Sequence, residues 1–255
     1  METSRRIFAK ALGAEAAMDV RRTYDHRSLA ESIGAVVAEE LPAIGAGPQE
    51  LLLHLVSESR ERLSVYSERF LELAQDRTCD TDEPALRRKA SLELAPFVIG
   101  TQYLLHAVAG NWNNEANYAL TALRIHATDV GVGQPGASRI DRYQEVLRSY
   151  SMADVGTDLR HTAEDSRISE GAFTFPAALL ILGCFPESLA GQILGANLYL
   201  RHCGLLPACR FVASDDAGTA WLLDLGCNPA DGDTGLRRDA LTATLRSAGE
   251  QGGEA

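Results

Sequence analysis

The feature that most constrains the fold is the stretch 185–204, which has the marks of one complete helix packed into a core. Pro186 suits a first helical position, and Gly204 is placed to end the helix. The apolar residues recur at spacings of 4, 3, 4 and 3 and form one stripe: Leu189, Ile193, Ala196, Leu200 and Cys203. Asn197 and Arg201 flank this stripe one turn apart, and polar side chains so close to a core need hydrogen-bond partners.

Helical spacing of apolar residues continues along most of the chain, and no stretch alternates apolar and polar residues as a half-buried strand does. Ser138 and Asp141 match a capping box at the start of one helix. Residues 152–170 have no clear period, so we expect a long connection of the kind that forms lids or binding loops. Helices are predicted over about 49–76, 83–94, 97–108, 115–128, 139–151, 173–185, 186–204, 208–225 and 236–248.

The length of 255 residues, with a mass of 27.5 kDa, suits one all-α domain with a large core. We predict N-terminal helices over 1–48 that pack on the bundle, a helical bundle over 49–248 and a disordered tail over 249–255. The formal net charge of −11 and the lack of a basic run argue against a nucleic-acid partner.

Cysteine usage and hydropathy bear on the cellular compartment. The five cysteines contain no Cys-x-x-Cys pair, which favours free thiols in a reducing compartment over a disulfide framework. No apolar segment has the pattern of a secretory signal or the length of a membrane span. The sequence therefore predicts a cytoplasmic protein without a membrane partner.

Two stretches resemble motifs of a known family. The pattern from Pro186 to Gly204, with Leu-Gly-x-Asn-Leu-x-Leu in its middle, resembles the late helix of the heme-oxygenase-like diiron oxidase and oxygenase superfamily. These iron-containing redox enzymes are common in bacterial natural-product pathways. The stretch from Asp129 to Tyr143 resembles the family segment Glu-x-Gly-x-Gly-x-Pro that precedes a metal-binding His. The resemblance implies a heme-oxygenase-like (TenA-like) helical bundle.

In this alignment the residues at the metal-ligand positions have changed. Asp129 stands at the position of the family's Glu, Arg139 at that of a His, and Arg201 at that of a carboxylate. The last family motif, His-x-x-x-Asp-x-x-His, falls on residues 210–221, which contain no His. A guanidinium stays protonated and cannot bind a metal cation. We therefore expect no metal cofactor and a charge-swapped pocket, in which Asp129 pairs with one or both arginines and a second carboxylate comes from Asp215 or Asp216.

The resemblance implies a metal-independent enzyme of specialised-metabolite biosynthesis. In this hypothesis an arginine-lined pocket binds an anionic or polar small-molecule substrate, since Arg recognises carboxylates and phosphates bidentately. Cyclisation, isomerisation, elimination and condensation are the reaction classes within reach, because such a pocket can orient a substrate and stabilise developing charge. The pocket candidates are Asp129, Arg139, Tyr143, Asn197, Arg201 and His106.

Two alternatives remain open. The chain could be a non-catalytic relative that acts as a carrier or as the partner of an active enzyme, and it could form a homodimer. It could also be a non-heme iron enzyme with atypical ligands, because facing helices can assemble a metal site in a bundle. The candidate ligands for that iron site are Glu93, His106, Glu115 and His126.

Overall fold

The computed structural model describes residues 4–10, 47–78, 83–108, 116–203, 212, 224–228 and 233–252. Every regular element in these residues is a helix and none is a strand, which confirms the all-α prediction. The helices are α1 (Ser4–Lys10), α4 (Pro48–Thr78), α5 (Glu83–Glu93), α6 (Ala95–Thr101), α7 (Asn117–Asp129), α8 (Arg139–Ser149), α9 (Leu159–Glu164), η2 (Glu170–Phe173), α10 (Thr174–Gly183), α11 (Pro186–Cys203) and α14 (Gly235–Gly252).

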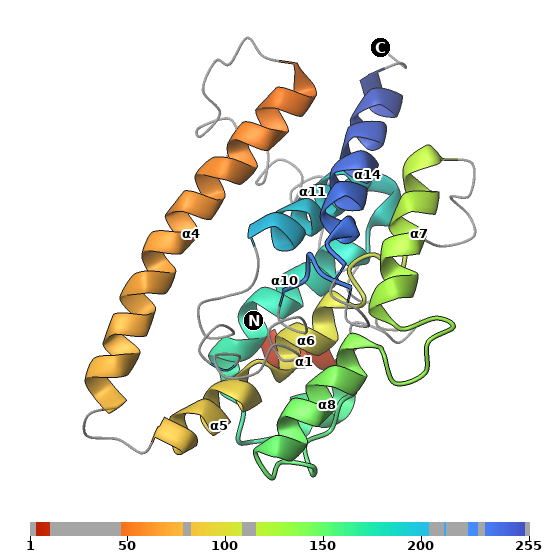
Figure 1. Ribbon diagram of the computed structural model, residues 1–255. Helices are drawn as coiled ribbons and strands as arrows, with labels where there is room; N and C mark the ends of the chain where they lie inside the picture. Colours follow the sequence, from red (N-terminus) through yellow and green to blue (C-terminus); the bar gives the residue numbers. More distant parts are fainter. Residues whose placement is uncertain are drawn as a thin grey trace.

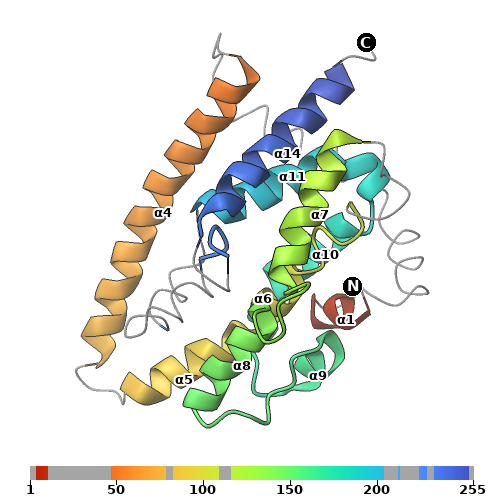
Figure 2. The same ribbon diagram turned by 45° about the vertical axis from the view of Figure 1, so that its right-hand side comes forward.

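Figures 1 and 2 show how these helices are arranged. The long helix α4 runs along one side of the molecule, and α11 and α14 lie between it and α7. Helices α6 and α10 pack against each other, and α1 contacts α10, α9 and η2. The core between these helices is apolar, with buried side chains such as Ile125 on α7, Leu147 on α8 and Ile193 on α11.

Helix α11 has the burial that its apolar spacing predicts. Leu189, Ile193 and Leu200 are all buried. Asn197 and Arg201, which flank this stripe, are buried as well, with exposed fractions of only 2% and 3%. The backbone at Leu189 leaves the helical region (φ −122°, ψ 22°), so α11 is kinked after its first turn. Two polar residues are therefore held inside the molecule by the C-terminal half of a core helix.

Residues 102–108 differ from the prediction, because they form turns where an apolar helix was expected. Helix α6 ends at Thr101, and the amides of Tyr103 and Leu104 bond to carbonyls only three residues back. Leu104 and Leu105 are nevertheless buried. The spacing of apolar residues predicts which side chains face the core. Here turns bury Leu104 and Leu105 without a helix.

Three other predictions need correction. The expected loop at 152–170 contains the short helix α9, which begins because the Asp158 side chain accepts hydrogen bonds from the amides of Arg160 and His161. Residues 249–252, expected in the disordered tail, continue α14. The segment 224–228, expected to hold the end of a helix, has no helical residue.

Several predictions fall on residues outside those described. These are most of the N-terminal helices proposed for 1–48, most of the helix proposed for 208–225, and the last three residues of the tail. The described part of the N-terminal region is α1.

Arg5 anchors α1 to the segment that follows α9. Its guanidinium donates hydrogen bonds to the carbonyls of Ala163 (2.8 Å), Asp165 (2.9 Å) and Ile168. The same group lies 4.4 Å from the centre of the Phe173 ring, in cation–π contact. Because one side chain bonds to three carbonyls at the end of α9 and just after it, α1 and these residues hold each other in place.

Candidate functional site

The connection between α7 and α8 brings two charged residues face to face. Asp129 is the last residue of α7, and Arg139 is the first residue of α8. At Gly131, where φ is +71°, a Cβ atom would lie 2.9 Å from the Ser138 nitrogen, so the turn requires glycine there. The predicted capping box is present, since Ser138 accepts from the Asp141 amide and Asp141 accepts from the Ser138 amide.

Asp129, Arg139 and Arg201 form what we call the ion cluster. Arg139 Nε donates to Asp129 Oδ1 over 2.7 Å, and Arg201 Nη1 donates to the same oxygen over 2.9 Å. Arg201 Nη2 donates to Asp129 Oδ2, so the contact between these two residues is bidentate. The exposed fractions of the three residues are 4%, 1% and 3%. The ion pairing expected from the sequence is thus present, with one carboxylate shared by two guanidinium groups.

Burial and the neighbouring charges shift the pKa values of Asp129 and Arg139. Burial by itself would raise the pKa of Asp129, but Arg201 and Arg139 lower it to about 2, so the carboxylate is ionised at neutral pH. Burial lowers the pKa of Arg139, and the neighbouring Asp129 opposes that effect. A guanidinium keeps its proton even so. The cluster therefore consists of one carboxylate anion and two guanidinium cations.

Backbone carbonyls of the segment 224–228 also bind the ion cluster. Arg139 Nη2 donates to the carbonyls of Leu225 (3.1 Å) and Cys227 (2.6 Å), and its Nη1 donates to that of Asp224 (3.4 Å). Arg201 Nη1 donates to the Leu225 carbonyl over 2.6 Å. Much of the donor capacity of the two arginines is therefore used inside the protein, where it holds an irregular segment against α8 and α11.

The close approach of this segment depends on Gly226. A Cβ atom at this position would lie 2.5 Å from the carbonyl oxygen of Arg201, on α11. Arg237 of α14 donates to that same carbonyl over 3.2 Å and pairs with the Asp224 carboxylate. Helix α14 is thus tied to the ion cluster through the segment and through the end of α11.

Asn197 lies beside the ion cluster with an incomplete set of hydrogen bonds. Its Oδ1 accepts from Arg201 Nε over 3.1 Å. Its Nδ2 is buried and has no hydrogen-bond partner in the described structure. An unmet buried donor costs about 1–3 kcal/mol, so this atom is a marked feature of the interior.

Two further buried side-chain atoms have no hydrogen-bond partner in the described structure. They are Nε2 of Gln102 and Nδ1 of His126. The His126 ring is within hydrogen-bond reach of the Gln102 backbone, and burial, together with nearby His106, lowers the pKa of His126. His126 lies on α7, three residues before Asp129, and the charges of Asp129 and Arg201 also act on its ring. His126 is consequently neutral at neutral pH.

The remaining candidates from the sequence take other places. Tyr143 is buried, and its hydroxyl donates to the Ser91 carbonyl over 2.5 Å, which ties α8 to α5. His106 is exposed, and its ring centre lies 5.7 Å from that of His126. Asp215 and Asp216 lie outside the described residues. The structure therefore brings Asn197 to the ion cluster and directs the Tyr143 hydroxyl to a structural contact.

The residues proposed for an iron site do not all meet. Glu93 accepts hydrogen bonds from the amide and hydroxyl of Ser169 and pairs with Lys89. Glu115 lies outside the described residues. Among the residues that the structure describes, no three His, Cys, Asp or Glu side chains are grouped as metal ligands. Of that set, Glu93, His106 and His126 are described, and the two histidines form a ring contact while Glu93 bonds to Ser169 and Lys89.

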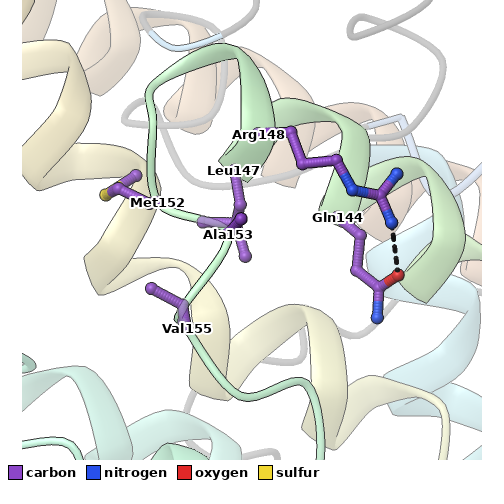
Figure 3. Close-up of a pocket in the computed structure, with 6 residues that line it drawn as sticks. All are labelled: Gln144, Leu147, Arg148, Met152, Ala153 and Val155. Atoms are coloured by element: carbon purple, nitrogen blue, oxygen red, sulfur yellow. Dashed lines mark hydrogen bonds between the residues drawn. The ribbon is translucent and has the colours of Figure 1, made fainter.

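A surface hollow of about 160 Å³ lies at the end of α8 (Figure 3). Its wall is apolar on one side and carries Arg148, whose guanidinium donates to the Gln144 side chain, on the other. The lining residues are Gln144, Leu147, Arg148, Met152, Ala153 and Val155. None of these residues belongs to the ion cluster, so the hollow is a separate feature.

The sequence missed Gln102 and the carbonyls of 224–228. Gln102 is a polar residue between the apolar runs 97–99 and 103–105, and that position is a signal that could have found it. The carbonyls carry no signal, because every residue has one and only the tertiary structure decides which of them meets an arginine.

No protein-family model matches the chain, and no curated protein and no solved structure is significantly similar to it. Among the described helices, none combines the length and the apolar character needed to cross a lipid bilayer.

Proposed function

We propose that this chain binds a small polar or anionic molecule in its helical interior, beside the ion cluster, and acts as a metal-independent enzyme of specialised metabolism. One observation carries the proposal: Asp129, Arg139 and Arg201 converge on one buried point, and the Nδ2 of Asn197 lies beside them without a partner. A buried donor that the protein leaves unmet is suited to a ligand that meets it.

The proposal includes a heme-oxygenase-like arrangement of the helices. The three positions that the family resemblance aligns with metal ligands come from the end of α7, the start of α8 and the last turn of α11. Asp129 and Arg201 are 72 residues apart in sequence, yet their side chains are in contact. This contact supports the alignment, because an incorrect alignment gives no reason for the three positions to meet.

In this proposal the charged residues have different roles. Asp129 and Arg139 are positioning residues, since Arg139 bonds to Asp129 and to the carbonyls of the segment 224–228. Asn197 and Arg201 face the ligand. Neutral His126 can accept a hydrogen bond or a proton from it. The arrangement suits reactions in which charge develops on an oxygen atom, as in isomerisation or elimination.

A second candidate function is that of a non-catalytic carrier or partner protein. It is favoured by the carbonyl contacts of the ion cluster, because guanidinium hydrogens that bond to the protein are not available to a substrate. Light scattering over a range of protein concentrations tests the partner role. A protein that stays monomeric, together with turnover of a small molecule, would exclude this candidate.

The main proposal is tested by ligand screening with the full chain. Small organic acids, ketones and neutral polar compounds are added, and the melting temperature is measured for the wild type, for Asn197→Leu and for Gln192→Leu, a matched change on the same helix. Compounds that stabilise the wild type and the Gln192 variant, but not the Asn197 variant, support the proposal. If no compound stabilises the wild type, the proposal is wrong.

The metal-independent part of the proposal has its own test. The protein is produced with added iron and its metal content is measured after purification. One iron per chain, bound tightly enough to survive dialysis against a chelator, would overturn this part and restore the iron alternative.

A further inference from the structure

The orientation of the Asn197 amide is set by its neighbour. Arg201 Nε is a hydrogen donor, and it lies 3.1 Å from Asn197 Oδ1. The flipped amide would direct its NH₂ group at a guanidinium, donor against donor, so the observed orientation is the only one that forms a bond. Nδ2 therefore points away from Nε, and both of its hydrogens lack an acceptor in the described structure.

Arg201 has one more N–H group on the side that faces Asn197. Four of the five guanidinium N–H groups have acceptors: Asn197 Oδ1, both oxygens of Asp129, and the Leu225 carbonyl. Since Nη1 and Nη2 bind the carboxylate end-on, the second hydrogen of Nη2 points to the same side as the Nε hydrogen. That side is occupied by the Asn197 amide.

Bulk water does not reach these donors, because Asn197 and Arg201 are only 2% and 3% exposed. Both residues lie on α11, one helical turn apart, and are held by the contacts of the ion cluster. The unmet groups on both side chains are donors, so the chemical group that complements them is an acceptor.

We propose that Asn197 Nδ2 and Arg201 Nη2 together receive one carboxylate oxygen of a small organic ligand. This inference rests on the proposed function and narrows it to a ligand class. A carboxylate suits the two donors because charge-assisted hydrogen bonds to an anion are about twice as strong as neutral ones. Asn197 selects for a ligand that carries a hydrogen-bond acceptor, because its NH₂ group contributes donors and no charge.

The test uses sodium formate and sodium acetate as probes, with sodium chloride at equal ionic strength as the reference and methylammonium chloride as a cation that offers only donors. Binding is followed by NMR through the side-chain NH₂ signals of Asn197 in the full chain. We expect saturable shifts with formate and acetate, and no shift with chloride or methylammonium.

Two variants make the test specific. Asn197→Asp keeps an oxygen acceptor for Arg201 Nε but replaces the NH₂ donors with a second oxygen, so we expect a folded protein with at least about tenfold weaker formate binding, equivalent to about 1.4 kcal/mol. The matched control Gln192→Glu adds the same charge on the same helix, and we expect it to bind formate as the wild type does. Backbone NMR spectra report formate binding to both variants.

Each other outcome overturns the inference. If the Asn197→Asp variant binds formate as well as the wild type does, Asn197 does not receive the carboxylate. If a crystal grown with formate shows only ordered water at Nδ2, the site is a hydration site. If neutral compounds stabilise the wild type through Asn197 while formate and acetate leave its signals unchanged, the proposed function stands and the carboxylate inference fails.

Discussion

Arg201 binds the carboxylate of Asp129 through both of its terminal nitrogens, and Arg139 shares one oxygen of the same carboxylate. The three side chains are buried and come from three helices. A buried ion pair is weak evidence of stability, because the loss of hydration offsets the attraction. Removing one partner of the pair is strongly destabilising, because it leaves the other charge buried and unpaired.

Replacing Asp129 is therefore expected to destabilise the protein strongly. Asp129→Asn leaves two buried guanidinium groups without their shared anion, and we expect a loss of about 3–5 kcal/mol in the free energy of unfolding. The measurement is urea denaturation followed by circular dichroism. Arg142→Ala is the control, because this arginine on α8 makes an exposed pair with Glu145 and should change stability by no more than about 0.5 kcal/mol. Equal effects of the two changes would contradict the ion cluster.

The same carboxylate predicts a dependence of stability on pH. Its pKa is lowered from the ordinary 3.8 to about 2, so its contribution is fully present above about pH 4 and is lost as the pH falls through 2. The lowering corresponds to roughly 2 kcal/mol. Other acids also titrate in this range, so the measured quantity is the difference in unfolding free energy between the wild type and Asp129→Asn. This difference should shrink by roughly 2 kcal/mol between pH 4 and pH 2, and a constant difference would exclude the effect.

Two glycine replacements should have opposite effects. Gly226→Ala places a Cβ atom 2.5 Å from the Arg201 carbonyl, so we expect it to lower the melting temperature and to loosen the segment 224–228. Gly195→Ala, inside α11, meets no atom within 4 Å, so it should stabilise the protein by about 0.5–1 kcal/mol through helix propensity. A stabilising Gly226→Ala would contradict the close approach.

The anchor of α1 is testable with two neighbouring arginines. Arg5→Ala removes the donors for the carbonyls of Ala163, Asp165 and Ile168 and the contact with Phe173, so we expect a loss of about 2–3 kcal/mol. Arg6→Ala is the matched control, because Arg6 is exposed on the same helix. Hydrogen exchange should show faster exchange in residues 159–170 of the Arg5 variant only. Unchanged exchange there would mean that the apolar contacts of α1, such as that between Phe8 and Phe173, are sufficient to dock it.

The predictable parts of the fold and the site are those that depend on near neighbours. The capping box of Ser138 and Asp141 joins residues three apart, and the apolar stripe of α11 repeats within one helix. The turn that brings Asp129 to Arg139 is local as well, since the two residues are ten apart. In each case the hydrogen bonds or spacings are specified within a few turns of chain, so sequence analysis could find them.

The rest of the site was set by contacts between distant parts of the chain. Residues 102–108 turn instead of continuing a helix, and the carbonyls of Leu225 and Cys227 accept from arginines more than twenty residues away. The sequence of residues 224–228 gives no signal for these contacts, because every residue has a backbone carbonyl. The sequence by itself determined that the protein is helical and that Asn197 and Arg201 stand beside an apolar stripe. Only the tertiary structure decided which of their hydrogen bonds are met and which remain for a ligand, because the partners of a buried polar group are chosen by long-range packing.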